Sequence, residues 1–215
     1  MRTLHDMEPA LTVRRLFAQF LARGARKLLL LAMFMAGFAL LGDGLYIKLK
    51  AVLAQHLLQQ AWQETLVTQA PQKAWSWADT YPVAAISFPG LDLKPVIALK
   101  GSSGEALAFA PGHLENTALP GQQGTAVYAA HRDTHFAFLE NIKATDIVKV
   151  KDIKGRDHLY KVDNIRIARW DQSGITNENT SQRIALITCW PFYAQTPGPL
   201  RYIVEGHLIK NSTLH

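Results

Sequence analysis

The sequence predicts an all-β domain of about eight strands, closed as a barrel or a sandwich, behind a helical N-terminal region. Three observations support this prediction. An uncharged apolar run begins at Leu28. Apolar residues at helical spacing then continue to Gln69 among strong helix formers. From Tyr81 onward, short β-type runs alternate with turns rich in glycine and proline, which is typical of a mainly antiparallel barrel or sandwich.

The positive charge of the chain is concentrated at its N-terminus. The 215 residues carry a net charge of +6, and residues 1–27 hold six basic and two acidic side chains, so the remainder is nearly neutral. Motifs of nucleic-acid-binding folds are lacking, and we expect no nucleic-acid partner. We interpret residues 1–27 as a cytoplasmic basic tail, partly amphipathic, that lies along the inner leaflet of a membrane.

Residues 28–48 are predicted to be a transmembrane anchor in contact with membrane lipid. The uncharged stretch to Gly42 is short for a span, but the residues up to a snorkelling Lys48 extend it to about 20. Basic residues precede it and few follow, which places the N-terminus in the cytoplasm and the rest of a single-pass plasma-membrane protein outside, in the periplasm. A cleaved signal peptide and a buried core helix are the alternatives, disfavoured by the long basic region and by the absence of a polar face.

Residues 49–80 are predicted to form a juxtamembrane helical stalk. Apolar side chains recur at helical spacing between Ala51 and Gln69, and Pro71 ends the pattern. We interpret Trp75 and Trp77 as an interfacial belt or as a plug on the domain that follows.

Residues 81–211 are predicted to form the β-domain. The expected strands are Val83–Phe88, Val96–Leu99, Leu107–Phe109, Thr125–Ala130, Ile147–Lys151, His158–Ile167, Ile184–Thr188 and Leu200–Ile209. Phe136–Leu139 is expected to be a short helical crossover.

Cys189 is the single cysteine of the chain, and it follows the buried-strand pattern Ile184–Thr188. Trp190 and Pro191 come next, and the proline stops the strand. A lone cysteine can be a small packed hydrophobe, and that interpretation stays open. On an exported chain, however, this thiol has no disulfide partner within the chain, which favours a working nucleophile.

A thiol nucleophile needs a basic partner and a group that stabilises developing charge. His131 follows its own apolar run, 124–130, so it would meet Cys189 if the two strands were neighbours. His135 is the competitor. Arg201 opens the last strand and stays protonated, which suits it to a carbonyl or an oxyanion, although a surface arginine at a strand end is an equal alternative.

These segments together resemble a sortase, a member of the membrane-anchored family of cysteine transpeptidases, over roughly residues 84–209. The matching pieces are the linker segments Ala110–His113 and Leu119–Gly121, the histidine segment Val127–Leu139, the cysteine motif Ala185–Cys189 and Arg201. The family motif is T-L-x-T-C, and here Ala185 replaces its first threonine, at a position expected to point into the barrel. The sequence Cys-Trp-Pro-Phe at 189–192 is similar to the proteobacterial, Gram-negative type.

The resemblance implies a closed β-barrel and a sortase-type peptidase of the hydrolase class. It implies that Cys189 attacks an L-P-x-T-G-like C-terminal sorting signal of an exported protein and forms a thioacyl intermediate. His131 would be the general acid and base, and Arg201 the stabiliser of substrate and oxyanion. Thr188 and Trp190 are expected to contact the substrate. An amine acceptor in the cell envelope would then receive the acyl group.

Two further expectations concern the loops. The polar segment 171–183 is expected to form a wall over the substrate groove. No metal and no other cofactor are expected, because the acidic residues Asp133, Glu140 and Asp146 are scattered across the crossover.

Two other functions remain as alternatives. An L,D-transpeptidase would also be exported and would also use cysteine and histidine, but its Ser-x-Gly-Cys context is missing around Cys189. A non-enzymatic, membrane-tethered adaptor with a packed cysteine belongs to a different class. Resistance of the folded thiol to alkylation would distinguish the adaptor from either enzyme.

Overall fold

The computed structural model describes residues 8–176 and 180–212, and its chain divides into two compact units, residues 1–52 and 53–215. The described part of the first unit is the beginning of helix α1 (Glu8–Thr68). The large apolar side chains described between Leu28 and Ile47 are exposed.

Among the described residues, we find no helix whose length and hydropathy would let it cross a lipid bilayer. The anchor expected over residues 28–48 therefore stays a prediction. It includes positions 39, 41 and 43, whose side chains lie outside the described residues, and residues 1–7 of the expected tail lie outside them as well.

In the second unit, the last part of α1 packs against the β-domain. Leu58 lies in one buried cluster with Leu99, and Trp62 lies in another with Ala85. The segment 49–80 predicted as a stalk is thus helical as far as Thr68, and one side of the helix is covered by the β-domain. Of the two tryptophans that follow, Trp75 packs edge-on against Phe109, at 5.2 Å between ring centroids, and Trp77 is exposed.

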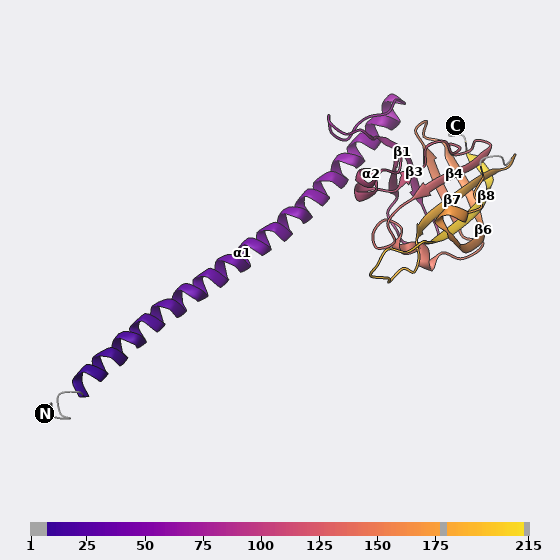
Figure 1. Ribbon diagram of the computed structural model, residues 1–215. Helices are drawn as coiled ribbons and strands as arrows, with labels where there is room; N and C mark the ends of the chain where they lie inside the picture. Colours follow the sequence, from indigo (N-terminus) through magenta and orange to yellow (C-terminus); the bar gives the residue numbers. More distant parts are fainter. Residues whose placement is uncertain (1–7, 177–179, 213–215) are drawn as a thin grey trace. The chain divides into compact units, whose positions relative to one another are not determined.

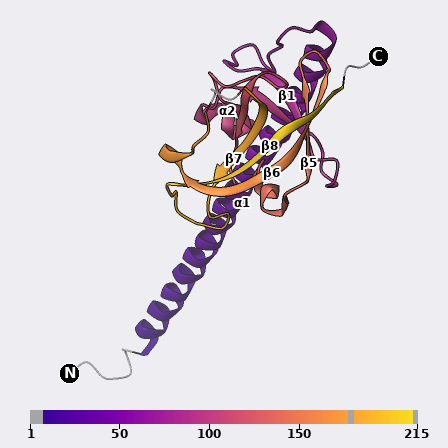
Figure 2. The same cartoon turned by 90° about the vertical axis from the view of Figure 1, so that its right-hand side faces the viewer.

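In the part of the chain that the structure describes, eight strands close into one barrel in the order β1-β2-β3-β4-β7-β8-β6-β5, with β5 returning to β1. Figures 1 and 2 show the barrel from two sides. Their bounds are β1 Pro82–Ser87, β2 Val96–Lys100, β3 Gly112–His113, β4 Gly124–Ala129, β5 Ile147–Asp152, β6 Asp157–Arg169, β7 Gln182–Cys189 and β8 Leu200–Ser212. The short helices are α2 Gly104–Phe109, η2 Ala137–Asn141 and η3 Trp170–Gln172. The pairs β2–β3 and β4–β7 are parallel, and the other neighbours are antiparallel. The prediction of a closed, mainly antiparallel barrel is confirmed.

The prediction was wrong at one strand and incomplete at another. Leu107–Phe109, expected as a strand, lies in helix α2, because the Ser103 hydroxyl accepts a hydrogen bond from the Ala106 amide at 3.2 Å and caps the helix. The strand that the sequence analysis missed is β3, which has only two residues. Its Gly112 lies so close to β2 that a Cβ atom there would be 2.2 Å from the Gly101 carbonyl oxygen.

Strands β4, β7 and β8 carry buried side chains on both of their faces. One face fills the barrel with Tyr128, Ile184, Leu186 and Val204. The opposite, outer face carries a second buried cluster, formed by Val127, Ala185 and Ile203 and covered by Leu114, Ala168, Ile175 and Ile187. This outer cluster leads along β7 to Cys189.

Candidate active site

Cys189 is the last residue of β7 and its side chain is partly buried. Side chains alternate along a strand, and Ala185 and Ile187 belong to the outer cluster, so Cys189 also lies on the outer face. The expectation that Ala185 points into the barrel was wrong. Both faces of β7 are buried, and its apolar pattern therefore does not reveal which face is the interior.

Arg201 is the direct antiparallel partner of Cys189 across β7 and β8. Opposed residues on neighbouring strands share a face of the sheet, so the arginine lies on the face of the thiol. Its Nη1 donates to the carbonyl oxygens of Gly198 at 2.8 Å and Leu200 at 2.9 Å. The hydrogen bonds described for this guanidinium use Nη1, and its planar fork carries three further N–H donors on Nε and Nη2.

His131 reaches the same end of the barrel through the parallel pairing of β4 with β7. The register runs from Gly124 opposite Gln182 to Ala129 opposite Ile187. It continues past the end of β4, where the Ala130 amide donates to the Ile187 carbonyl at 3.1 Å. One further step brings His131 level with Cys189, and its side chain is exposed.

His135, the competing histidine, is turned toward another part of the domain. Its ring forms a hydrogen bond with the Phe109 carbonyl, at the end of α2. Burial lowers the pKa of His135, the nearby His131 lowers it further, and the bond to Phe109 opposes both effects in part. The structure therefore leaves His131 as the histidine at the level of the thiol.

Thr188 and Trp190, the two expected substrate contacts, differ in position. Thr188 is buried and points into the barrel, where its hydroxyl donates to the Ala130 carbonyl at 2.8 Å. It thus ties β7 to the residue before His131. Trp190 is partly buried and stacks on Tyr202 at 5.6 Å between centroids. Contact of either residue with a substrate stays a prediction.

The segment expected as a wall over the groove is described except for residues 177–179. Ile175 covers the outer cluster, and the Thr125 hydroxyl of β4 donates to the Thr176 carbonyl at 3.3 Å. This part of the segment therefore lies over the face that leads to Cys189.

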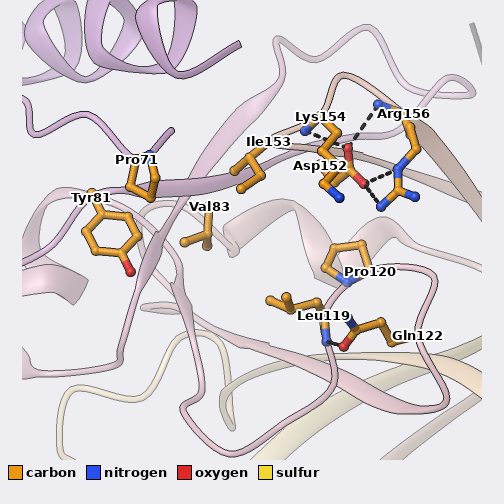
Figure 3. Close-up of a pocket in the computed structure, with 10 residues that line it drawn as sticks. All are labelled: Pro71, Tyr81, Val83, Leu119, Pro120, Gln122, Asp152, Ile153, Lys154 and Arg156. Carbon is orange, nitrogen blue, oxygen red and sulfur yellow. Dashed lines mark hydrogen bonds and ion pairs between the residues drawn. The ribbon is translucent and has the colours of Figure 1, made fainter. Parts of the chain in front are cut away.

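A cavity of about 260 Å³ lies at the other end of the barrel, where β4 and β7 begin (Figure 3). Asp152, at the end of β5, closes one side of it and accepts hydrogen bonds from Arg156 Nε at 2.8 Å and from the His158 ring at 3.0 Å. Burial alone raises the pKa of Asp152, but the hydrogen bonds from His158 and Arg156 outweigh burial and lower it to about 2. This cavity is separate from the cysteine site.

Arg132, the residue after His131, was not among the predicted site residues. Its guanidinium is partly buried, and Nη2 donates to the carbonyl oxygens of Ala194 at 2.5 Å and Thr196 at 3.3 Å. The signal available in the sequence was an arginine directly beside the candidate histidine. Its partners lie more than sixty residues along the chain, and only folding brings them together.

The sequence model of the sortase domain matches residues 86–209, which is more than half of the chain. The chain belongs to the sortase family. Its similarity extends to Sortase D of Bacillus subtilis (strain 168), which is 28% identical over 109 residues, covering 50% of this chain and 54% of the relative. The chain thus spans about half the length of that curated sortase.

Solved sortase structures share the barrel. Sortase C1 of Streptococcus agalactiae, solved with MTSET, is 27% identical with a TM-score of 0.54, covering 60% of this chain and 68% of the other. A Clostridium perfringens Sortase D5 transpeptidase has a TM-score of 0.59 over 74% of this chain and 99% of the other; at 20% identity it supports the fold alone. The resemblance to sortases and the barrel implied by it are confirmed. The family is one of cysteine transpeptidases, so the expectation of an enzyme of this class is also confirmed at family level.

Proposed function

We propose that this sortase is a transpeptidase that cleaves an L-P-x-T-G-like C-terminal sorting signal of an exported protein and transfers it to an amine in the cell envelope. One observation carries the proposal. Three adjacent strands, β4, β7 and β8, bring His131, Cys189 and Arg201 to one level at one end of the barrel. A nucleophile, a proton carrier and a fixed cation are the groups that acyl transfer requires.

The acylation step follows from these three groups. The Cys189 thiolate attacks the carbonyl carbon of the signal threonine, a C–S bond forms, and the carbonyl electron pair moves onto oxygen. Arg201 donates N–H groups to that oxyanion. As the oxyanion collapses, the C–N bond to glycine breaks and protonated His131 donates its proton to the departing amine.

Deacylation runs through the same residues in reverse roles. The acceptor amine attacks the thioester carbonyl and gives a proton to His131, the new C–N bond forms, and the Cys189 thiolate leaves. Water in place of the amine would release the protein as a free acid. The same site therefore supports both transfer and hydrolysis, and the acceptor decides between them.

The outer cluster supports an extended peptide as the substrate. Val127, Ala185 and Ile203 are buried on three neighbouring strands, and the partly buried Ile187 and Ile175 pack against them, Ile175 from the loop before β7. Apolar side chains of a bound signal would cover the part of these two isoleucines that is still exposed to water. Trp190, which follows Cys189 in the chain and is partly exposed, is proposed as a further contact.

A packed-cysteine adaptor is the second candidate, and the position of the thiol disfavours it. Cys189 lies at a strand end and is partly exposed, whereas the core residues before it, such as Leu186, are fully buried. An L,D-transpeptidase is disfavoured by the family match over residues 86–209.

We also propose that residues 28–48 hold this sortase in the plasma membrane with its barrel in the periplasm, and that it is of the proteobacterial type. The uncharged run from Leu28, the basic residues before it and the Cys-Trp-Pro-Phe sequence support this. Protease protection of intact spheroplasts tests the topology: the barrel should be digested from outside, and digestion only after lysis would contradict the proposal.

The function is tested with the full-length chain in detergent, incubated with a quenched library of L-P-x-T-G-like peptides and analysed by mass spectrometry. We expect a thioacyl adduct on Cys189, resolved by added amines, and no adduct in Cys189→Ala. A folded protein that forms no adduct with any peptide, and whose thiol resists iodoacetamide, would support the adaptor instead.

A further inference from the structure

The β7–β8 loop, residues 190–199, joins the nucleophile to the arginine of the proposed site. Two guanidinium groups hold its backbone. Arg201 binds the Gly198 and Leu200 carbonyls at the C-terminal end of the loop, and Arg132 binds the Ala194 and Thr196 carbonyls in its middle. Arg132 is adjacent to His131, so its bonds connect the histidine segment to the loop between Cys189 and Arg201.

The environment of Arg132 makes these bonds stronger than ordinary surface contacts. Its Nη1 is buried and has no hydrogen-bond partner among the described residues. Part of the guanidinium is therefore desolvated without gaining a protein acceptor in exchange. Hydrogen bonds donated by a charged group are stronger than neutral ones, and they gain strength where water is excluded. The planar fork also fixes the direction of its donors, which a lysine ammonium does not.

The same loop has a second connection that serves as a contrast. The Tyr193 hydroxyl donates to Glu140 of η2 at 2.5 Å. The Tyr193 side chain, however, is 79% exposed, so water competes for both partners when this bond breaks. The bond from Arg132 to Ala194 is therefore partly buried, whereas the bond from Tyr193 to Glu140 is exposed.

We propose that Arg132 is a positioning residue, which sets the distance between His131 and Cys189 by holding the β7–β8 loop against the histidine segment. This inference rests on the proposed function for its effect on turnover. Strand pairing fixes Cys189 and Arg201 to each other, but His131 lies past the end of β4. Among the described residues next to His131, Arg132 forms hydrogen bonds directly to the backbone of that loop.

Loss of this tie affects catalysis more than substrate binding. A proton carrier displaced by about 1 Å can cost about 100-fold in rate. The outer cluster on β4, β7 and β8, in contrast, does not include Arg132. We therefore expect kcat of Arg132→Ala to fall about 10- to 100-fold with little change in KM.

The experiment compares full-length wild type, Arg132→Ala, Arg132→Lys and Tyr193→Phe in detergent. Two readouts are used: kcat and KM with a cleaved peptide, and the rate of chymotrypsin cleavage after residue 193 in the β7–β8 loop, which requires no sorting signal. We expect faster cleavage and low kcat for Arg132→Ala, intermediate values for Arg132→Lys, and values near wild type for Tyr193→Phe. Guanidinium chloride at non-denaturing concentration should restore part of kcat in Arg132→Ala.

Three results would overturn the inference. A raised KM with unchanged kcat would make Arg132 a substrate contact. Unchanged kcat and unchanged cleavage would leave it without a role in the site. An equal loss of kcat in Arg132→Lys and Arg132→Ala, with no rescue by guanidinium and an unchanged cleavage rate, would show that the guanidinium group does not hold the loop. Should wild type form no thioacyl adduct, the proposed function fails, and the cleavage readout alone still tests the tie.

Discussion

Cys189 and Arg201 are opposed residues of β7 and β8, and this pairing fixes the thiol and the guanidinium on one face of the sheet. A short loop that reverses the chain would not by itself ensure this, because a shift of one residue in register turns every side chain of a strand to the other face. The pairing continues along both strands, where the buried Leu186 is opposed to the buried Val204, so the register is held by buried residues rather than by the loop.

Replacement of Arg201 by lysine should reduce turnover strongly. A lysine cannot reproduce the fork that binds the Gly198 and Leu200 carbonyls and also offers donors to an oxyanion. We expect kcat to fall about 100- to 1,000-fold, the usual effect of losing an oxyanion donor. Arg169→Lys is the matched control, since Arg169 is an exposed arginine at the adjacent end of β6, paired with Asp171. Equal turnover in wild type and Arg201→Lys would exclude the role.

Alanine variants of His131 and His135 should differ clearly in their effect on kcat. His131→Ala is expected to lower kcat about 100- to 10,000-fold, as for loss of a general acid and base. His135→Ala should keep kcat within a few-fold of wild type and lose about 1 kcal/mol of stability with its bond to Phe109. Steady-state kinetics and thermal unfolding measure both effects, and a larger loss of kcat in His135→Ala would reverse the assignment.

Substitutions of Thr188 distinguish a structural role from substrate contact. Thr188→Val leaves the buried Ala130 carbonyl without its donor, and we expect a loss of about 1–3 kcal/mol in the free energy of unfolding. Thr188→Ser keeps the hydroxyl and should lose less. Chemical denaturation followed by tryptophan fluorescence provides the measurement. A raised KM in Thr188→Val at unchanged stability would instead show that the hydroxyl contacts the substrate.

Asp152 should make the barrel sensitive to acid. Its pKa is about 2 in the folded protein and about 4 in the unfolded chain, so its contribution of about 2 kcal/mol is present above pH 4. The contribution is lost as the pH falls through 2, because the folded state must then take up the proton as well. Asp152→Asn should be less stable than wild type by about that amount at pH 7, and the difference should narrow toward pH 2. A difference that does not depend on pH would contradict this account.

A methyl group at Gly112 should disrupt the pairing of β2 with β3. The added Cβ would lie 2.2 Å from the Gly101 carbonyl oxygen and 3.0 Å from the Ser102 Cα, both backbone atoms that cannot turn aside. We expect Gly112→Ala to cost about 1–3 kcal/mol. Gly104→Ala, where a Cβ would meet nothing within 4 Å, is the control and should be neutral or slightly stabilising. Equal melting temperatures of the two variants would show that the strand pair can shift to accept the methyl group.

Much of the site could be predicted because its strands are long and buried. β4 and β7 read as continuous apolar runs, as parallel strands covered on both faces do, and each run ends at a polar residue of the site. Because the whole run is apolar, the sequence also does not show which face of β7 points into the barrel. Ile184, Ala185 and Leu186 are all buried, so their hydrophobicity does not distinguish the interior from the outer face, and the side chain of Ala185 was assigned to the wrong one.

The sequence by itself determined most of the strands, the positions of Cys189, His131 and Arg201 at or next to strand ends, and the family, because periodicity and local motifs are properties of neighbouring residues. Only the tertiary structure decided that Thr188 points inward, that His135 binds Phe109, and that Arg132 reaches the β7–β8 loop. These contacts join residues far apart in the chain, and their geometry depends on the register of the closed barrel. Local composition does not encode that register.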